Sequence, residues 1–321
     1  MTIVPQSDAC PACGATEVVT LCRGTDRIFG TTTDTFYVVE CKGCRLLRLY
    51  PWPKPYELSR YYPPRYWYDP SADPSDRLAE LWRRLVLRDH VNFVRKALAN
   101  SRARGLVLDV GCGGGLFLRE LGLANNEIVG FDFSVEAAGV AWRTNGVPAA
   151  CGSLTLPPLR SGSCRLVTMF HVLEHLYDPA SYLDAARQLL AEDGRLVIQV
   201  PNAACWQFLL LGEAWNGIDI PRHLVNFRLQ DVEILLRECG YEPLRVKHFS
   251  MRDNPAGLAT SLAPSLDPMG RRVRELAESG RTRLLKDFAY FGLMLACIPP
   301  TLIEALCRAG STVMVEARVR R

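Results

Sequence analysis

The chain has 321 residues, of which 48% are hydrophobic and 22% are charged, a balance typical of a globular protein that buries a core. Its 38 Lys and Arg residues against 34 Asp and Glu residues leave a net charge of +4, too small for a chain selected mainly to bind nucleic acid, so no nucleic-acid partner is expected. The first residues lack a basic segment followed by an apolar one, so no secretory signal is expected and a reducing cytoplasm is the predicted location.

Two C-x-x-C pairs mark the N-terminal segment, Cys10 with Cys13 and Cys41 with Cys44. Their separation of 27 residues is compatible with a zinc ribbon, in which two knuckles close on one tetrahedral ion. Four thiolates without a matching His or carboxylate favour a closed structural site over a catalytic one. A redox-active C-x-x-C is the alternative, but it would need a βαβ frame that this segment lacks. We predict a zinc-ribbon-like domain over residues 1–50 with one structural Zn²⁺.

A stretch rich in Pro and aromatic residues, 51–74, follows and is interpreted as a linker. Asp73 and Pro74 then offer an N-cap and a first-turn proline, and apolar residues recur at three- to four-residue spacing until Gly105. This pattern predicts one long amphipathic helix at the start of a second domain, 75–321.

Beyond Gly105, short apolar runs alternate with helical stretches, which predicts an α/β fold with helices on both faces of a parallel sheet. Between the last two strands, residues 251–310 are too long for a hairpin loop and should form helices of their own. Their apolar run, 288–298, is shorter than the ~20 residues of a membrane span, so a buried or interfacial helix and no transmembrane segment are expected. We predict a doubly wound, seven-stranded, mostly parallel sheet with a helical insertion. Strands are expected at 106–110, 128–131, 147–151, 165–170, 195–200, 243–249 and 312–319, and helices at 116–123, 134–144, 179–190 and 230–239.

A glycine-rich loop that contains Asp109, Gly111, Gly113 and Gly115 follows the first of these strands and opens the first helix. Glycines at this place allow a tight turn and let the backbone approach a ligand at a helix N-terminus. A dinucleotide fingerprint would need glycine where Leu116 stands. The Asp109 carboxylate would repel a pyrophosphate, but it suits a ligand with a positive charge, such as S-adenosylmethionine.

The run Asp109 to Gly115, D-V-G-C-G-G-G, resembles the first motif of class I S-adenosylmethionine-dependent methyltransferases, a Rossmann-like family. The run Gly130 to Ser134, G-F-D-F-S, resembles their second motif, and the resemblance covers roughly residues 105–249. It implies that the glycine loop lines the methionine half of the cofactor and that Asp132 accepts the two ribose hydroxyls. An ionised carboxylate offers the paired acceptor oxygens for this role. The alternative role for Asp132, capping the next helix, can be filled by Ser134.

The run H-V-L-E-H, His171 to His175, resembles one branch of the same superfamily and implies that His171 faces the cofactor. Glu174 and His175 are interpreted as starting or bracing the next loop. An inverted zinc-protease motif is the alternative, and it is disfavoured because the run lies at a strand end without a long surrounding helix. Many relatives carry an acidic residue after the third strand to bind adenine. This chain has Gly152 and Ser153 there, so Ser153 is the expected, uncharged contact.

The acceptor is expected at the loop after the fifth of these strands, because doubly wound folds bind ligands above the carboxyl ends of their strands. The segment Pro221 to Leu224 again resembles this branch. His223, beside Arg222 and Asp219, can act as a general base near neutral pH, since the unperturbed pKa of histidine is ~6.5. The alternative is that Arg222 and His223 cap a helix or brace the loop. Aromatic rings are expected to wall the cleft, namely Trp206, Trp215 and the Tyr61–Tyr68 cluster.

These motifs predict a methyltransferase that acts on a small molecule or glycan, with oxygen as the expected methyl acceptor, in natural-product or polysaccharide biosynthesis. The cysteine pairs and aromatic linker resemble the zinc domain of sugar C-methyltransferases, so C-methylation of a nucleotide-activated sugar is the alternative, although those enzymes carry a further C-terminal domain. A second alternative is a non-catalytic zinc-ribbon module with a degenerate methyltransferase fold, because Cys164 and Arg165 stand where relatives read F-D. The insertion 251–310 is expected beside the cleft, where it helps to select an apolar or bulky acceptor. A dimer interface or a lipid-facing patch is its competing use, and no particular oligomeric state is predicted.

Overall fold

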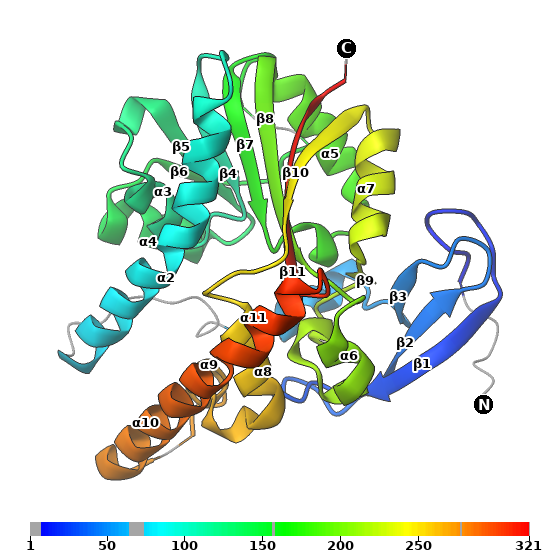
Figure 1. Ribbon diagram of the computed structural model, residues 1–321, viewed down its shortest axis with the longest axis vertical. Coiled ribbons are helices and arrows are strands. Elements are labelled where there is room, and N and C mark those ends of the chain that lie inside the picture. Colours follow the sequence, from blue (N-terminus) through cyan, green and yellow to red (C-terminus); the bar gives the residue numbers. More distant parts are fainter. Residues whose placement is uncertain (1–7, 64–73, 156–157, 277, 321) are drawn as a thin grey trace.

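The computed structural model describes residues 8–63, 74–155, 158–276 and 278–320, with side chains from residue 82 onward in the second range. Within these ranges the chain forms a four-stranded sheet and a seven-stranded sheet, the larger one covered by helices (Figure 1). Three of the aromatic residues predicted to wall the cleft, Tyr66, Trp67 and Tyr68, and the predicted N-cap Asp73 lie outside the described residues.

The larger sheet confirms the predicted doubly wound, seven-stranded, mostly parallel architecture. Its order is β10-β11-β8-β7-β4-β5-β6, and among these described strands β11 alone runs antiparallel to both of its neighbours. Every strand predicted for this sheet is present, although β8 begins earlier than expected. The strands are β4 (Leu106–Val110), β5 (Ile128–Asp132), β6 (Ala149–Cys151), β7 (Cys164–Phe170), β8 (Leu190–Pro201), β10 (Tyr241–Lys247) and β11 (Thr312–Val319).

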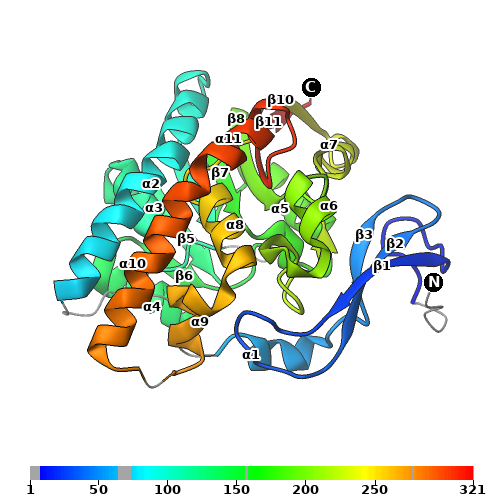
Figure 2. The ribbon, with the colours of Figure 1, turned by 60° about the horizontal axis from the view of Figure 1, so that its bottom comes forward.

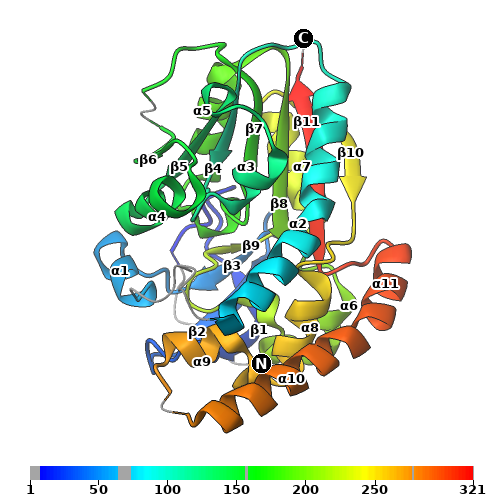
Figure 3. The same cartoon turned by 90° about the vertical axis from the view of Figure 1, so that its left-hand side faces the viewer.

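Two hydrophobic cores lie on opposite faces of this sheet, because successive side chains of a strand point to opposite sides. In β4, Leu108 and Val110 join one core, whereas Val107 joins the other. Since both faces are buried, the strands appear in the sequence as continuous apolar runs. Helices α5 (Pro179–Leu189) and α7 (Leu229–Glu238) cover the first core, and α2 (Pro74–Ala99), α3 (Leu116–Leu121) and α4 (Val135–Asn145) cover the second (Figure 3).

The smaller sheet crosses the predicted domain boundary. Strands β1 (Val18–Gly24), β2 (Phe36–Cys41) and β3 (Leu47–Tyr50) pair antiparallel, and β3 then pairs with β9 (Val225–Asn226). Figure 2 shows β1 to β3 beside the larger part of the molecule. The predicted first domain, 1–50, therefore completes its sheet with a strand from the predicted acceptor loop.

Four helices form the predicted helical insertion between β10 and β11 within the described residues: α8 (Asn254–Leu262), α9 (Pro268–Val273), α10 (Gly280–Ala296) and α11 (Ile298–Leu306). Helix α10 packs Met294 against Ala259 of α8, and Phe291 meets Trp82 of α2 edge to face at 5.2 Å between ring centroids. The remaining short elements are η1 (Pro55–Glu57), α1 (Leu58–Tyr61), η3 (Asn125–Glu127), η4 (Leu173–His175), α6 (Trp206–Leu211), η5 (Gly212–Ala214), η6 (Asn216–Ile218) and η7 (Pro264–Leu266).

The apolar part of the insertion is longer than the sequence pattern indicated. Gly280–Leu306 is a helical stretch of 27 residues, and within the described chain it is the one segment long and apolar enough to cross a membrane. Only 22% of its most apolar window is buried. The predicted run 288–298 thus lies inside a longer and mostly exposed helical arm. Length and composition alone do not show that this arm crosses a membrane.

Candidate active site

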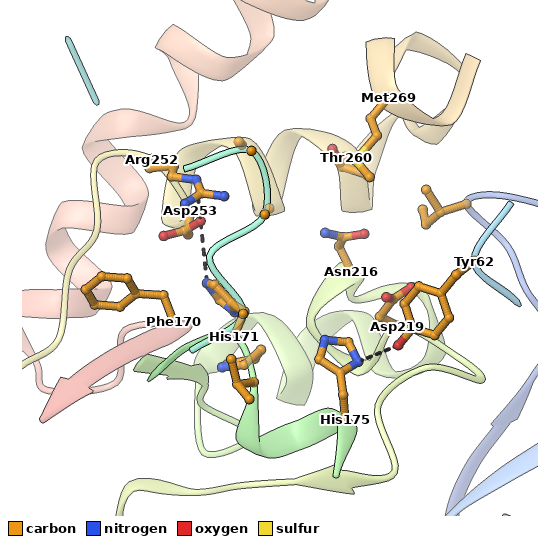
Figure 4. Close-up of a pocket in the computed structure, with 18 of the residues that line it drawn as sticks. Tyr62, Phe170, His171, His175, Asn216, Asp219, Arg252, Asp253, Thr260 and Met269 are labelled. Carbon is orange, nitrogen blue, oxygen red and sulfur yellow. Dashed lines mark hydrogen bonds and ion pairs between the residues drawn. The ribbon is translucent and has the colours of Figure 1, made fainter. Parts of the chain in front are cut away.

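A large cavity of about 2220 Å³ lies beyond the carboxyl ends of β4, β5, β7 and β8. Its wall combines the glycine loop after β4, the end of β5, the segment after β7 and the loop that precedes β9. Typical small-molecule pockets measure ~300–1,000 Å³, so this cavity has room for two ligands side by side. The helical insertion closes the opposite side, as Figure 4 shows for residues of α8 and α9.

Asp109, the last residue but one of β4, is a buried carboxyl group in the cavity wall. The Thr168 hydroxyl donates a hydrogen bond of 2.6 Å to its Oδ1 atom. Burial, with a smaller contribution from the charge of Asp132, raises the pKa of Asp109 to about 7. A cationic ligand in the cavity would favour the ionised carboxylate, as the sequence argument for S-adenosylmethionine requires.

Two of the loop glycines predicted to bind the cofactor, Gly111 and Gly113, line the cavity. Gly111 has φ +71°, and a Cβ atom there would come within 2.6 Å of the Val172 side chain. Gly113 has φ +52°, and a Cβ atom there would meet nothing within 4 Å. Gly111 therefore allows close packing of the loop on Val172, and the backbone at Gly113 borders open space, as the approach of a ligand requires.

Two other predicted cofactor residues, Gly115 and Ser153, are not among the residues that line the cavity. Gly115 has φ +77°, and a Cβ atom there would lie 3.0 Å from the Cβ of Ala141, so this glycine allows close helix packing. Ser153 is exposed, and its hydroxyl lies 2.8 Å from the Thr155 hydroxyl and 3.1 Å from that of Tyr182. Its polar group is thus engaged at the surface rather than in the cavity.

Asp132 ties the two predicted cofactor motifs together. Its Oδ2 atom accepts a hydrogen bond of 2.8 Å from the Gly113 backbone N–H, and Oδ1 accepts one of 2.9 Å from that of Ser134. Burial raises the pKa of Asp132, and these two backbone donors oppose the shift. Ser134 caps α4 by accepting from Ala137, as proposed for it, so Asp132 keeps its remaining lone pairs in the cavity wall.

His171 lines the cavity in a left-handed backbone conformation, with φ +55°. Its Nδ1 atom lies 3.1 Å from Glu174 Oε1, and its Nε2 atom lies 3.6 Å from Asp253 Oδ1 (Figure 4). Burial acts to lower the pKa of His171, but these two carboxylates prevail and raise it to about 9. Asp253 belongs to the predicted insertion 251–310 and is part of no sequence motif, so its contact with His171 was not predicted.

The other side of the cavity holds a pair of histidines. The rings of His175 and His223 lie edge to face with their centroids 4.7 Å apart, and both line the cavity. Burial and the neighbouring His223 lower the pKa of His175 to about 4. The Tyr62 hydroxyl lies 3.0 Å from His175 Nδ1, as the dashed line in Figure 4 shows. His175 was expected only to brace a loop, so its place in the wall was missed.

The structure separates the roles of the neighbours Arg222 and His223. The Arg222 guanidinium is fully buried between Asp219, at 2.6 Å, and Asp26 of the N-terminal segment, at 2.9 Å. Burial opposes ionisation of Asp26, but Arg222 outweighs it and lowers the pKa of this carboxyl to about 2. Arg222 therefore braces the loop, the alternative considered for both residues, whereas His223 faces the cavity.

The predicted aromatic wall is partly confirmed. Tyr62 and Trp215 line the cavity. Tyr61 instead packs edge to face on Phe36, and Trp206 is 42% exposed on α6 away from the lining. The insertion contributes its own apolar side chains to the wall, namely Leu284, Phe288, Tyr290, Phe291 and Met294 of α10.

The four cysteines of the two C-x-x-C pairs meet in the structure, away from the cavity wall. The Sγ atoms of Cys10 and Cys44 lie 3.6 Å apart, and those of Cys13 and Cys41 lie 3.5 Å apart. Four thiolates at ~2.3 Å around one tetrahedral Zn²⁺ would be about 3.8 Å apart, so the arrangement fits this ion. The chain offers no fifth cysteine at this cluster among its described residues.

The sequence matches the pattern of the methyltransferase domain family over residues 79–246. A ubiquinone biosynthesis O-methyltransferase from Glaesserella parasuis serovar 5 is 27% identical in an alignment of 198 positions, which covers 56% of this chain and 79% of that protein. The one from Pectobacterium carotovorum subsp. carotovorum is 28% identical in an alignment of 192 positions, which covers 55% of this chain and 80% of that protein. A solved S-adenosylmethionine-dependent methyltransferase from Archaeoglobus fulgidus is similar with a TM-score of 0.47 at 16% identity, covering 76% of this chain and 99% of that one.

Proposed function

Because this chain belongs to the methyltransferase domain family and is an S-adenosylmethionine-dependent methyltransferase, we propose that it methylates a hydroxyl oxygen of a small molecule. The observation that carries this proposal is the shared cavity. Asp109, Gly113 and Asp132 line one part of it, and His175 and His223 line another. The similar proteins named as O-methyltransferases support oxygen as the methyl acceptor.

We assign the cofactor to the β4 and β5 side of the cavity. Bound S-adenosylmethionine supplies an activated methyl group on a positively charged sulfur. The Asp109 carboxylate matches that positive end of the ligand, and the loop at Gly113 leaves the backbone free for close contact. Asp132 offers its free lone pairs to a vicinal diol.

The acceptor would lie between the histidine pair and α10. Methyl transfer is an in-line displacement at carbon, so the protein must align the acceptor oxygen with the methyl group and exclude water. Apolar side chains of α10, such as Phe288 and Met294, suit an apolar or bulky acceptor. We retain His223 as the general base that takes the proton from the acceptor hydroxyl, because it lines the cavity while Arg222 holds its loop in place.

Product analysis tests the proposal. The zinc-loaded enzyme would be incubated with S-adenosylmethionine labelled in its methyl group and with phenols, aliphatic alcohols and nucleotide-activated sugars. We expect a methyl ether, identified by mass and by the position of the label. A product with the methyl group on carbon would contradict the assignment to oxygen.

For the N-terminal segment we propose one structural Zn²⁺ held by Cys10, Cys13, Cys41 and Cys44. The sulfur separations support a closed site, and among the described residues no His or carboxylate joins the cluster. This ion would stabilise the small sheet, whose strand β9 follows His223 closely in the chain.

A further inference from the structure

The histidine pair of the cavity wall, His175 and His223, together with the buried Glu174 next to it, forms a second cluster of potential metal ligands. One ligand atom each of Glu174, His175 and His223 lies within 4.8 Å of the others. Glu174 and His175 come from η4 after β7, and His223 comes from the loop before β9. The fold thus brings together two segments that lie almost fifty residues apart in the sequence.

Glu174 has an unsatisfied oxygen at this cluster. The residue is 1% exposed, and its Oε1 atom is engaged by His171 at 3.1 Å. Its Oε2 atom has no hydrogen-bond partner among the described residues. A buried carboxylate oxygen without a partner is costly, so this atom indicates that a positively charged or hydrogen-bonding ligand is missing.

Hydrogen bonds orient both histidines for metal binding. His223 Nδ1 lies 2.8 Å from the Gly217 carbonyl oxygen, and His175 Nδ1 lies 3.0 Å from that of Arg222. A carbonyl oxygen only accepts, so each Nδ1 carries a proton, and Nε2 is the atom of each ring that can bind a metal. Metal-binding histidines commonly donate their second N–H to a carbonyl in this way.

We propose that Glu174, His175 and His223 bind one divalent cation that holds the acceptor hydroxyl beside the methyl donor. This inference rests on the proposed O-methylation. Two imidazole nitrogens and one carboxylate oxygen suit a transition-metal ion such as Zn²⁺, Fe²⁺ or Mn²⁺. Metal–ligand bonds of ~2.0–2.2 Å place ligand atoms about 3–3.5 Å apart, which small side-chain rotations achieve. Three protein ligands leave further positions open for the acceptor oxygen.

The cation would change how the acceptor proton is removed. A cation next to a hydroxyl lowers its pKa, so the O–H bond breaks and the proton leaves to solvent without requiring an imidazole base. The oxygen then forms a bond to the methyl carbon while the carbon–sulfur bond of the donor breaks. The products are a methyl ether, S-adenosylhomocysteine and one proton. In this scheme His223 would bind the cation and would not act as the base that the proposed function assigns to it without the cation.

Mn²⁺ titration followed by electron paramagnetic resonance tests the site in the full-length, zinc-loaded protein. Mn²⁺ prefers oxygen and nitrogen to thiolate ligands, so the cysteine cluster competes little for it. We expect one bound Mn²⁺ per chain, and at least a tenfold weaker affinity in Glu174→Gln and in His223→Gln. His248→Gln is the matched control, because this half-buried histidine lies outside the cavity wall and should keep full binding.

Activity and cofactor binding separate this inference from the proposed function. Chelation of the cation should lower methyl transfer at least tenfold, Mn²⁺ should restore it, and calorimetric binding of S-adenosylmethionine should persist in both variants. Equal Mn²⁺ binding in wild type and both variants, or no binding in the wild type, would overturn the site. Methyl transfer to oxygen that survives chelation would overturn its role and leave the proposed function intact. Site-specific Mn²⁺ binding without any methyl transfer to oxygen would instead refute the proposed function.

Discussion

Asp109 is a buried carboxyl group whose charge should control cofactor affinity. Burial raises its pKa to about 7, so the neutral form prevails below that pH. A cationic ligand prefers the ionised form, so the affinity for S-adenosylmethionine should increase as pH rises from 5.5 to 7 and then level off. The increase should approach tenfold per pH unit at the acidic end. Calorimetric titrations across this range would measure it.

Asp109→Asn is the matched variant, because it keeps the shape of the side chain and removes the titration. Its affinity should be weak and nearly independent of pH. A wild-type affinity that does not change between pH 5.5 and 7 would show that Asp109 does not face the positive end of the cofactor.

The ion pair of Asp26 with Arg222 should contribute strongly to stability. Both side chains are fully buried, so Asp26→Ala removes one of the two carboxylates that neutralise the guanidinium. Breaking such a pair costs about 3 kcal/mol of unfolding free energy. Asp34→Ala breaks the exposed pair with Arg60 and should cost less than ~1 kcal/mol. Urea unfolding of both variants would measure the difference, and equal losses would contradict the account.

The same pair predicts a pH dependence of stability. The pKa of Asp26 is about 2 in the folded protein, below its ordinary value of 3.8. Its contribution is therefore complete above pH 4 and is lost as the pH falls through about 2. Unfolding measured between pH 5 and 2 should show this loss in the wild type and a shallower one in Asp26→Ala. Parallel pH profiles for the two proteins would contradict it.

The sequence motifs predicted which residues line the cavity where the local geometry of the chain determines the role of the residue. Asp109, Gly113 and Asp132 lie at or shortly after the carboxyl ends of β4 and β5, and all three line the cavity. Residues whose roles depend on distant partners were missed or misplaced. Asp253 reaches His171 from the insertion, and the Ser153 hydroxyl is held by Tyr182 from another helix.

Helix α10 contributes apolar side chains to the part of the cavity where we place the acceptor. Two of its residues, one inside and one outside the cavity lining, can be compared. Phe288 and Leu285 are similarly exposed, at 65% and 70%, but Phe288 lines the cavity and Leu285 lies outside the lining. Phe288→Ser should raise the KM for an apolar acceptor about fivefold, since roughly 1 kcal/mol of apolar contact is lost. Leu285→Ser should leave KM unchanged. Liposome binding and oligomeric state would be measured on both variants, and a change confined to oligomeric state would contradict the role in acceptor selection.

The proposed Zn²⁺ at the cysteine cluster should stabilise the small sheet. Thiolate ligands come together only in the folded segment, so zinc binding is coupled to folding. We expect one Zn²⁺ per chain by mass spectrometry of the metal content. Cys41→Ser should lower the zinc content and reduce hydrogen-exchange protection of β1 to β3. Cys22→Ser is the control, because Cys22 lies in β1 outside the cluster and should retain zinc. An unchanged N-terminal segment without zinc would refute this proposal.

At the scale of the whole molecule, the large sheet was predictable and the small one was not. Strands buried on both faces give continuous apolar runs between helices, a local signal that survives without knowledge of the partners. Strand β9 has two residues, Val225 and Asn226, and exists because it pairs with β3 of a distant segment. A strand of two residues is too short to show an alternation of apolar and polar side chains. The pairing of β9 with β3, which links the two predicted domains, therefore could not be predicted.

This link makes the N-terminal segment a support of the acceptor loop. Strand β9 pairs with β3, and Arg222 is anchored by Asp26 of the same segment. His223 lies between these two attachments. Loss of zinc should therefore reduce kcat even though no cysteine of the cluster lines the cavity.

Calorimetric titration of the zinc-loaded protein with S-adenosylmethionine tests the central claim most directly. The account predicts one binding site per chain and a loss of about a hundredfold in affinity for Asp132→Ala, since two hydrogen bonds to a carboxylate are worth about 3 kcal/mol. Asp184→Ala, which removes an exposed carboxylate on α5, should bind as the wild type does. A folded wild-type protein that binds no S-adenosylmethionine would contradict the account.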